Sequence, residues 1–214
     1  EGRADVVHLA LDIRGHGRSA GQVNPGFGLP GFVGHQIHDA EAYVYRGAFL
    51  DCGRALEFLA ARAEVDAARI AVEGMSQGGG LAFATAALFP GRVAACAAGV
   101  PFLGVPQDHF RIRPVYREEM EQHLRLAGRG TWADTLRSLE LVNPWHLAPR
   151  ITCPVFMAVA LRDDDCPPHL GFAVYNRLGV PRSYRIFPAY GHMMNGEWPA
   201  AAGAWLRRQL GLPE

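Results

Sequence analysis

Residues 74–78 read Gly-Met-Ser-Gln-Gly, and they are the most informative five residues of the chain. The apolar-rich run before it, Arg69–Glu73, is typical of a strand, and the Ala-rich run after it, Gly78–Phe89, is typical of a helix. A strand, a Gly-x-Ser-x-Gly turn and a helix in this order predict a nucleophile elbow, which lifts the Ser76 hydroxyl above a sheet. We expect glycine at both ends of the pattern because a Cβ there would crowd the neighbouring strand or helix.

Outward from this elbow, runs typical of strands alternate with runs typical of helices. The predicted strands are Val6–Leu11, Ile70–Glu73, Val93–Ala98, Val155–Leu161 and Tyr184–Phe187. The predicted helices are Arg46–Arg62, Gly78–Phe89, His169–Leu178 and Trp198–Leu210. Most of the strands are continuously apolar, as in a parallel sheet buried on both faces. The sequence therefore predicts an α/β fold, a mostly parallel sheet with flanking helices.

Two stretches interrupt the alternation. Residues 15–38 are rich in Gly and Pro and predict a long loop, which in a compact domain is usually functional or disordered. Residues 102–149 lie between two strands and carry helical patterns at Val115–Leu126 and Trp132–Leu141. We interpret this stretch as a helical lid inserted into a single domain that spans residues 1–214.

Composition excludes several classes of function. The 214 residues are 49% hydrophobic and carry 21 basic and 21 acidic side chains, so neither nucleic acid nor an anionic membrane is an expected partner. No apolar run approaches the roughly 20 residues that span a bilayer. The four cysteines, Cys52, Cys96, Cys153 and Cys166, have no disulfide or metal spacing. We expect free thiols, a reducing and cytoplasmic location, and no metal or organic cofactor.

Acyl transfer by a serine needs a base that takes the serine proton and an acid that orients the base. In α/β-hydrolases these groups follow in the order Ser, Asp or Glu, His, each after a strand. Here Asp163 directly follows the strand Val155–Leu161, and His192 follows the strand Tyr184–Phe187. Chain order therefore predicts a triad of Ser76, an acid from the run that begins at Asp163, and His192.

Alternatives to the acid and the base lie nearby. Asp164 and Asp165 follow Asp163 directly, and the pattern alone does not separate the three. His169 is the only other histidine after the acidic run, and its position after two prolines is typical of a helix start.

The oxyanion of the reaction needs backbone donors. The N–H of Gln77, the residue after the nucleophile, is the expected first donor. No His-Gly-Gly loop that would supply a second donor occurs in the chain. We therefore expect the early strands and the second donor to lie upstream, in a larger enzyme of which this is the C-terminal part.

These motifs together resemble the acetyl xylan esterase / cephalosporin-C deacetylase family of carbohydrate esterases. The segment Gly74–Gly79 matches the family's Gly-x-Ser-Gln-Gly-Gly motif in full. Further similar segments are Tyr45–Asp51, Val65–Asp66, Pro101–Leu103, Cys166–Pro168 and Ala173–Asn176. The resemblance covers nearly the whole chain and implies Asp163 as the acid and His192 as the base. It also implies a hexamer, and a second oxyanion donor on a tyrosine upstream of Val6–Leu11.

The chain departs from the family pattern at two positions. The family's Arg-Gly-Gln reads Arg14-Gly15-His16 here, and its His-Glu reads His192-Met193. The triad predicts a serine esterase for short acyl groups, and the resemblance implies that it removes acetyl most of all, from sugars or from related alcohols such as cephalosporin C. The alternatives are a serine peptidase, a general carboxylesterase, and a non-catalytic module of the same fold. The substrate-binding residues stay open.

Overall fold

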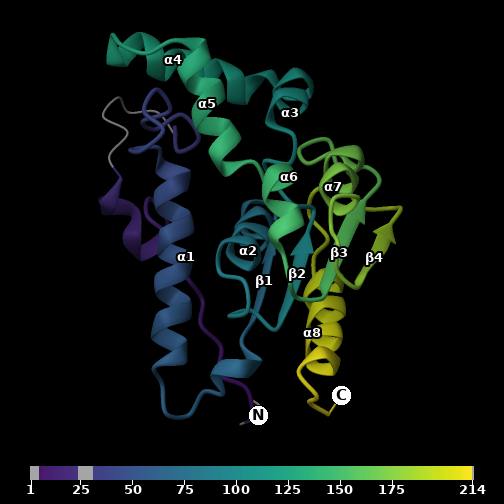
Figure 1. Ribbon diagram of the computed structural model, residues 1–214. Helices are drawn as coiled ribbons and strands as arrows, with labels where there is room; N and C mark the ends of the chain where they lie inside the picture. Colours follow the sequence, from purple (N-terminus) through teal and green to yellow (C-terminus); the bar gives the residue numbers. More distant parts are fainter. Residues whose placement is uncertain (1–4, 24–30, 214) are drawn as a thin grey trace.

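In the computed structural model, residues 5–23 and 31–213 are described. Four strands form one parallel sheet in the order β1-β2-β3-β4, as Figure 1 shows. The strands are β1 (Ala71–Met75), β2 (Ala95–Gly99), β3 (Val155–Ala160) and β4 (Arg182–Phe187). β2 and β3 are buried along their whole length, as central strands of a covered parallel sheet are. Four of the five predicted strands are thus confirmed, with shifts of one or two residues at their ends.

Helices follow the strands and cover the sheet. The main helices are α1 (Val44–Ala60), α2 (Gln77–Leu88), α7 (Pro168–Tyr175) and α8 (Glu197–Gln209). Helix α2 packs against β1 and β2, whereas α8 packs against β2 and β3. These four helices correspond to the four that the sequence predicts, and the alternation of strand and helix is that of an α/β fold.

Aromatic packing fixes α8 against the sheet. The ring of Trp198 is almost fully buried and stacks on Phe156, with ring centroids 5.7 Å apart. A Cβ on Gly99 would lie 2.8 Å from the Trp198 ring, so the indole lies directly on the backbone of β2. This contact anchors the start of the helix that follows the His192 loop.

Four further helices lie between β2 and β3, in the stretch expected to form a lid. They are α3 (Pro106–Ile112), α4 (Pro114–Ala127), α5 (Trp132–Val142) and α6 (Pro144–Leu147). In Figure 1, α3, α4 and α5 lie at the end of the molecule toward which the strand arrows point. Both predicted helical patterns are confirmed, and the sequence missed α3 and α6, which are short and begin with proline.

The described part of the long loop packs against α4. The carboxylate of Glu119 on α4 accepts a hydrogen bond of 2.8 Å from the backbone N–H of Gly34. His123 Nε2 lies 3.1 Å from the carbonyl oxygen of Gly31. The loop also contains a short 3-10 helix, η1 (Gly17–Gln22), that the sequence did not predict. Residues 24–30, which fall in this predicted loop, lie outside the described part of the structure.

The prediction of a buried strand at Val6–Leu11 is wrong. These residues form no described strand, and Val7, Leu9 and Leu11 are 50%, 41% and 42% exposed. An apolar segment forms a strand only where its backbone can pair with a neighbouring strand. Among the described strands, none pairs with Val6–Leu11. β1 is therefore an edge strand of the described sheet.

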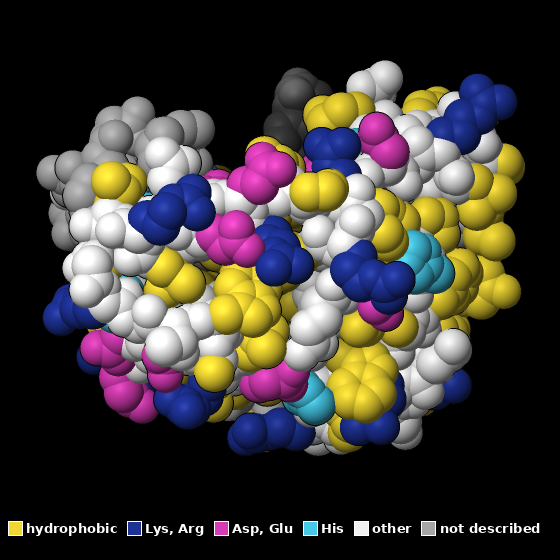
Figure 2. Space-filling model, turned by 90° about the horizontal axis from the view of Figure 1, so that it is seen from above, with side chains coloured by type: hydrophobic (Ala, Val, Ile, Leu, Met, Phe, Trp, Pro, Cys, Tyr) yellow, Lys and Arg dark blue, Asp and Glu magenta, His cyan; other side chains and the backbone are white. Residues whose placement is uncertain are grey.

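All four cysteines are buried and free, as expected from their spacing. Within the described ranges, none of the helices has the length and apolar character that crossing a membrane requires. Figure 2 shows that acidic and basic side chains are interspersed on the face seen from above, with hydrophobic side chains between them. This mixture agrees with the balanced charge of the sequence.

Candidate active site

The turn between β1 and α2 holds Ser76 in a conformation that L-residues rarely adopt. Its backbone angles are φ 55° and ψ −120°. The strain is supported by two backbone hydrogen bonds, from Ser76 N–H to Gly99 O at 2.8 Å and from Phe102 N–H to Ser76 O at 3.0 Å. Backbone strain of this kind persists only where surrounding contacts hold it, and it clusters at functional sites. The geometry is that of the predicted nucleophile elbow.

The two glycines of the pattern differ in what they need. A Cβ on Gly74 would lie 2.2 Å from the carbonyl oxygen of Gly78, so only glycine fits there. A Cβ on Gly78 would meet no atom within 4 Å. The expectation that both glycines are sterically required is therefore wrong for Gly78, since its α-carbon faces open space. The crowding on the helix side falls one residue later, where a Cβ on Gly79 would lie 2.7 Å from Gly99 O.

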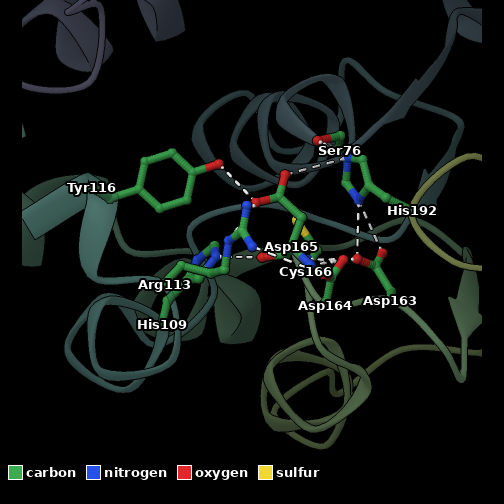
Figure 3. Close-up of polar contacts among 9 residues, drawn as sticks. All are labelled: Ser76, His109, Arg113, Tyr116, Asp163, Asp164, Asp165, Cys166 and His192. Atoms are coloured by element: carbon green, nitrogen blue, oxygen red, sulfur yellow. Dashed lines mark hydrogen bonds and ion pairs between the residues drawn. The ribbon is translucent and has the colours of Figure 1, made fainter.

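Three loops bring the predicted triad together at the carboxyl ends of the strands. Ser76 follows β1, Asp163 follows β3 and His192 follows β4. His192 Nε2 lies 2.8 Å from Ser76 Oγ. His192 Nδ1 lies 3.0 Å from Asp163 Oδ2 and 3.1 Å from Oδ1. A hydroxyl, an imidazole and a carboxylate are thus joined in one line, as Figure 3 shows.

The structure separates the three aspartates that the sequence left open. The side chain of Asp163 is fully buried and accepts backbone hydrogen bonds from Asp165 and Cys166 at 2.9 and 2.8 Å. The side chain of Asp164 is 86% exposed. That of Asp165 is 24% exposed and reaches the other nitrogen of the imidazole, Nε2, at 3.7 Å. Only Asp163 contacts Nδ1, the nitrogen that faces away from Ser76.

The rival histidine lies apart from this arrangement. His169 is the second residue of α7 and is exposed, in agreement with the expectation that it belongs to a helix start.

The pKa of His192 is raised above its ordinary value of about 6.5. The largest cause is the hydrogen bond with Asp163, to which the negative charges of Asp163, Asp165 and Asp164 add, while burial acts in the opposite direction.

The backbone N–H of Gln77, the expected oxyanion donor, lies at the start of α2. Gln77 is the first residue of α2, so its N–H has no partner within the helix. The side chain of Gln77 donates a hydrogen bond of 3.1 Å to the hydroxyl of Tyr45 on α1. Tyr45 is buried, and burial is the main reason that its pKa is raised far above the usual range of tyrosine. The contact therefore fixes the start of α2 against α1.

Sequence reasoning missed three side chains of the helical insertion (residues 106–147, α3 to α6) that reach the acidic loop Asp163–Asp165. The hydroxyl of Tyr116 donates to Asp165 Oδ1 at 3.0 Å, and Arg113 Nε lies 3.3 Å from the same oxygen. His109 Nε2 lies 2.6 Å from the backbone carbonyl of Asp165. His109 lies on α3, Tyr116 lies on α4 and Arg113 joins the two helices. Their residue types and spacing carry no signal that points to the loop, because the contacts arise from tertiary packing.

Within residues 5–23 and 31–213, one group of side chains brings three possible metal ligands together. The ligand atoms of Asp165, Cys166 and His192 lie within 4.8 Å of one another. Burial, however, raises the pKa of the Cys166 thiol far above its usual range, so the thiolate that metals bind is disfavoured. His192 Nε2 is also engaged with Ser76. These residues fit a resident metal poorly.

The two departures from the family pattern lie in different surroundings. The ring of His16 packs edge-on against Phe32, with ring centroids 4.5 Å apart. Arg14, two residues earlier, forms a bidentate pair with Asp51, with distances of 2.9 and 2.8 Å. Met193 is 63% exposed. Neither His16 nor Met193 takes part in the contacts among Ser76, Asp163 and His192.

Comparison with known proteins identifies relatives of this chain. The model of a protein family described as acetyl xylan esterase (AXE1) matches residues 3–209. The acetyl esterase Axe7A of Xylanibacter ruminicola is 29% identical over 193 residues, which are 84% of this chain and 40% of that protein.

Solved structures show the same likeness. An acetyl xylan esterase from Paenibacillus sp. R4 is 34% identical, with a TM-score of 0.79 over 94% of this chain and 64% of that one. Acetyl xylan esterase 1 from Thermoanaerobacterium sp. is 31% identical, with a TM-score of 0.76 over 92% of this chain and 64% of that one. The chain thus spans less than two thirds of the length of these relatives. Its fold is that of the α/β-hydrolases.

Proposed function

This chain belongs to the acetyl xylan esterase (AXE1) family, and from that premise we propose that it acts as a serine esterase that removes acetyl groups from sugar hydroxyls. The observation that carries the proposal is the line of hydrogen bonds from Ser76 through His192 to Asp163. A hydroxyl, an imidazole and a carboxylate in this order are the groups that acyl transfer by serine uses.

In the first half of the proposed reaction, Ser76 Oγ attacks the carbonyl carbon of the acetyl ester. His192 Nε2 takes the serine proton during the attack and then gives it to the departing sugar oxygen. Asp163 accepts the hydrogen bond of Nδ1–H, which fixes the tautomer that leaves Nε2 free as a base. The products of this half are the free sugar and an acetyl group bound to Ser76.

Water completes the cycle in the second half. His192 Nε2 takes a proton from a water molecule, whose oxygen attacks the acetyl-serine carbonyl, and returns that proton to Ser76 Oγ. The N–H of Gln77 donates to the oxyanion in both halves, and loss of one such donor raises the barrier by about 3–4 kcal/mol in known enzymes. The reaction needs no metal and no organic cofactor.

The substrate class follows from the relatives. Two solved relatives are acetyl xylan esterases, which supports acetylated xylo-oligosaccharides as substrates. Cephalosporin C also carries an acetyl ester and is a second candidate substrate. A cytoplasmic location and assembly into a homo-oligomer, a hexamer by family analogy, stay predictions. So does the role of residues 102–149 as a lid.

Substitution of the nucleophile in the full-length protein tests the proposal. Ser76→Ala should lower acetate release from an acetyl ester by at least about a thousandfold and prevent labelling by a fluorophosphonate. Ser183→Ala, at an exposed serine on β4, is the matched control and should leave both unchanged. Undiminished turnover by Ser76→Ala would refute the assignment.

A substrate panel separates the rival functions. A preference for acetyl over butyryl and peptidyl esters supports the proposal. Faster hydrolysis of butyryl esters would indicate a general carboxylesterase, and cleavage of peptides would indicate a peptidase. Absence of fluorophosphonate labelling at Ser76 in a folded full chain would favour a non-catalytic module.

A further inference from the structure

The carboxylate of Asp165 lies on the reacting side of the imidazole. Asp165 Oδ2 is 3.7 Å from His192 Nε2, the same nitrogen that contacts Ser76 Oγ. Asp163, by contrast, contacts Nδ1. Figure 3 shows His192 on one side of Asp165 and Tyr116 on the other. The chain therefore places a second carboxylate beside the atoms that react.

Contacts from the helical insertion hold this carboxylate in place. Tyr116 donates a hydrogen bond to Asp165 Oδ1, and Arg113 Nε forms an ion pair with the same oxygen. His109 donates to the backbone carbonyl of Asp165, and its ring is almost fully buried. Because Oδ1 is occupied from the side of the insertion, Oδ2 is the oxygen that faces His192.

The proposed reaction brings the substrate to this oxygen. His192 Nε2 must come within hydrogen-bond reach of the departing alcohol oxygen in order to protonate it. Because Asp165 Oδ2 is 3.7 Å from Nε2, an alcohol oxygen within about 3 Å of Nε2 is also close to this carboxylate. The alcohol group next to the ester bond thus lies beside a carboxylate, whereas the acetyl group lies toward Ser76 and Gln77.

Nearby positive charge does not fully offset this carboxylate. Arg113 is shared between two acids, since its NH1 also lies 3.8 Å from Asp164 Oδ2. The negative charge of these carboxylates also acts on the imidazole. The pKa of His192 is raised first by the hydrogen bond with Asp163 and then also by the charges of Asp165 and Asp164. The leaving-group side of the site is therefore negative.

We infer that Asp165 determines specificity for the alcohol half of the ester, an inference that rests on the proposed function. It favours esters whose alcohol carries a positive charge or a hydrogen-bond donor near the ester bond, and it disfavours anionic alcohols. Neutral sugars, which offer hydroxyl donors next to the acetylated position, fit this site. Esters of alcohols that carry a carboxylate do not.

Three acetyl esters of matched chemistry test the inference. Acetylcholine and 3,3-dimethylbutyl acetate have the same shape and differ by one positive charge, and acetoxyacetate supplies a negative charge. The full chain should show a kcat/KM for acetylcholine roughly three- to tenfold above that for the neutral ester, and the lowest value for acetoxyacetate. In Asp165→Asn, which keeps the side-chain shape, the ratio of the first two should fall to about one.

Two further variants separate charge from structure. Asp164→Asn removes an exposed neighbouring carboxylate and should change the ratio by less than about twofold. Arg113→Gln removes the compensating cation and should raise the preference for acetylcholine, an effect that loss of structure alone does not produce.

The outcomes for the inference and for the proposed function are distinct. An unchanged ratio in Asp165→Asn that still hydrolyses the neutral ester would overturn the inference and leave the esterase intact. If Asp165→Asn does not fold, the unsubstituted protein alone decides: a higher kcat/KM for the neutral or the anionic ester than for acetylcholine overturns the inference. No turnover of any of the three esters, with no fluorophosphonate labelling, would overturn the esterase and the inference with it.

Discussion

His192 and Asp163 are joined by a hydrogen bond from Nδ1 to a carboxylate whose side chain has no exposed surface. The carboxylate is held in turn by the backbone N–H groups of Asp165 and Cys166. A buried acceptor in a fixed position allows only one tautomer, the one with the proton on Nδ1. Nε2 is then free to accept the proton of Ser76.

This relationship predicts unequal effects for neighbouring substitutions. Asp163→Asn should lower kcat by about ten thousandfold, because an amide stabilises the wrong tautomer and not the charged imidazole. Asp164→Asn should change kcat by less than about threefold, because that side chain is 86% exposed and does not contact the imidazole. Steady-state hydrolysis of a neutral acetyl ester measures both. Equal losses in the two variants would show that the acid has been assigned to the wrong residue.

The raised pKa of His192 predicts the acid limb of the pH profile. The imidazole must be neutral to act as a base, so kcat/KM should fall as the pH drops through a pKa above 6.5. The hydrogen bond with Asp163 is the main cause of the raised pKa, and the charges of Asp165 and Asp164 contribute.

Removal of a contributing charge should therefore move the limb in a known direction. Asp165→Asn lowers the pKa of His192, so its acid limb should shift to lower pH, and Asp164→Asn should produce a smaller shift of the same sign. The readout is the pH dependence of kcat/KM for a neutral ester. A shift to higher pH in Asp165→Asn would contradict the electrostatic account.

The two elbow glycines should respond differently to the same substitution. Gly74→Ala places a Cβ 2.2 Å from the backbone of Gly78 and should lower the free energy of unfolding by about 1–3 kcal/mol or more. Gly78→Ala places a Cβ in open space within a helix and should leave stability unchanged or raise it by up to about 1 kcal/mol. Urea unfolding of both variants, with fluorophosphonate labelling as a check on the site, makes the comparison. Equal destabilisation would mean that the elbow is crowded at both ends.

The parts of the fold that the sequence predicts are those with strong local signals. β2 and β3 are continuously apolar runs between clear helices, so their type and order follow from pattern alone. The positions of Ser76, Asp163 and His192 also follow, because parallel strands bring the loops after their carboxyl ends to one edge of the sheet.

The parts that the sequence did not predict depend on contacts between distant residues. The run Val6–Leu11 has the pattern of a strand, but pattern does not supply a pairing partner. Local pattern alone does not separate Asp163 from Asp165, and only the family resemblance favoured Asp163, because the burial of that carboxylate beside the imidazole is a tertiary contact. The approach of Tyr116 to Asp165 joins residues 49 apart in the chain and leaves no trace in local composition.

The surface between the first described segment and α1, together with the open edge of β1 among the described strands, predicts self-association of these 214 residues when they are expressed alone. Leu9, Leu11 and Phe58, all more than 40% exposed, line a groove of about 580 Å³ on this face together with charged side chains such as Arg14 and Arg54. β1 also offers an unpaired edge among the described strands. Open strand edges and contiguous apolar surface both favour association between copies.

Charged substitutions on this face should reverse that association. The double variant Leu9→Lys and Leu11→Lys should scatter less light and elute at a lower apparent mass than the parent at equal concentration. Leu126→Lys and Leu141→Lys, at two exposed leucines on α4 and α5, form a control of equal added charge and should have a smaller effect. A parent chain that is monodisperse and melts cooperatively would contradict the prediction. Equal improvement in both double variants would assign the effect to net charge and not to this face.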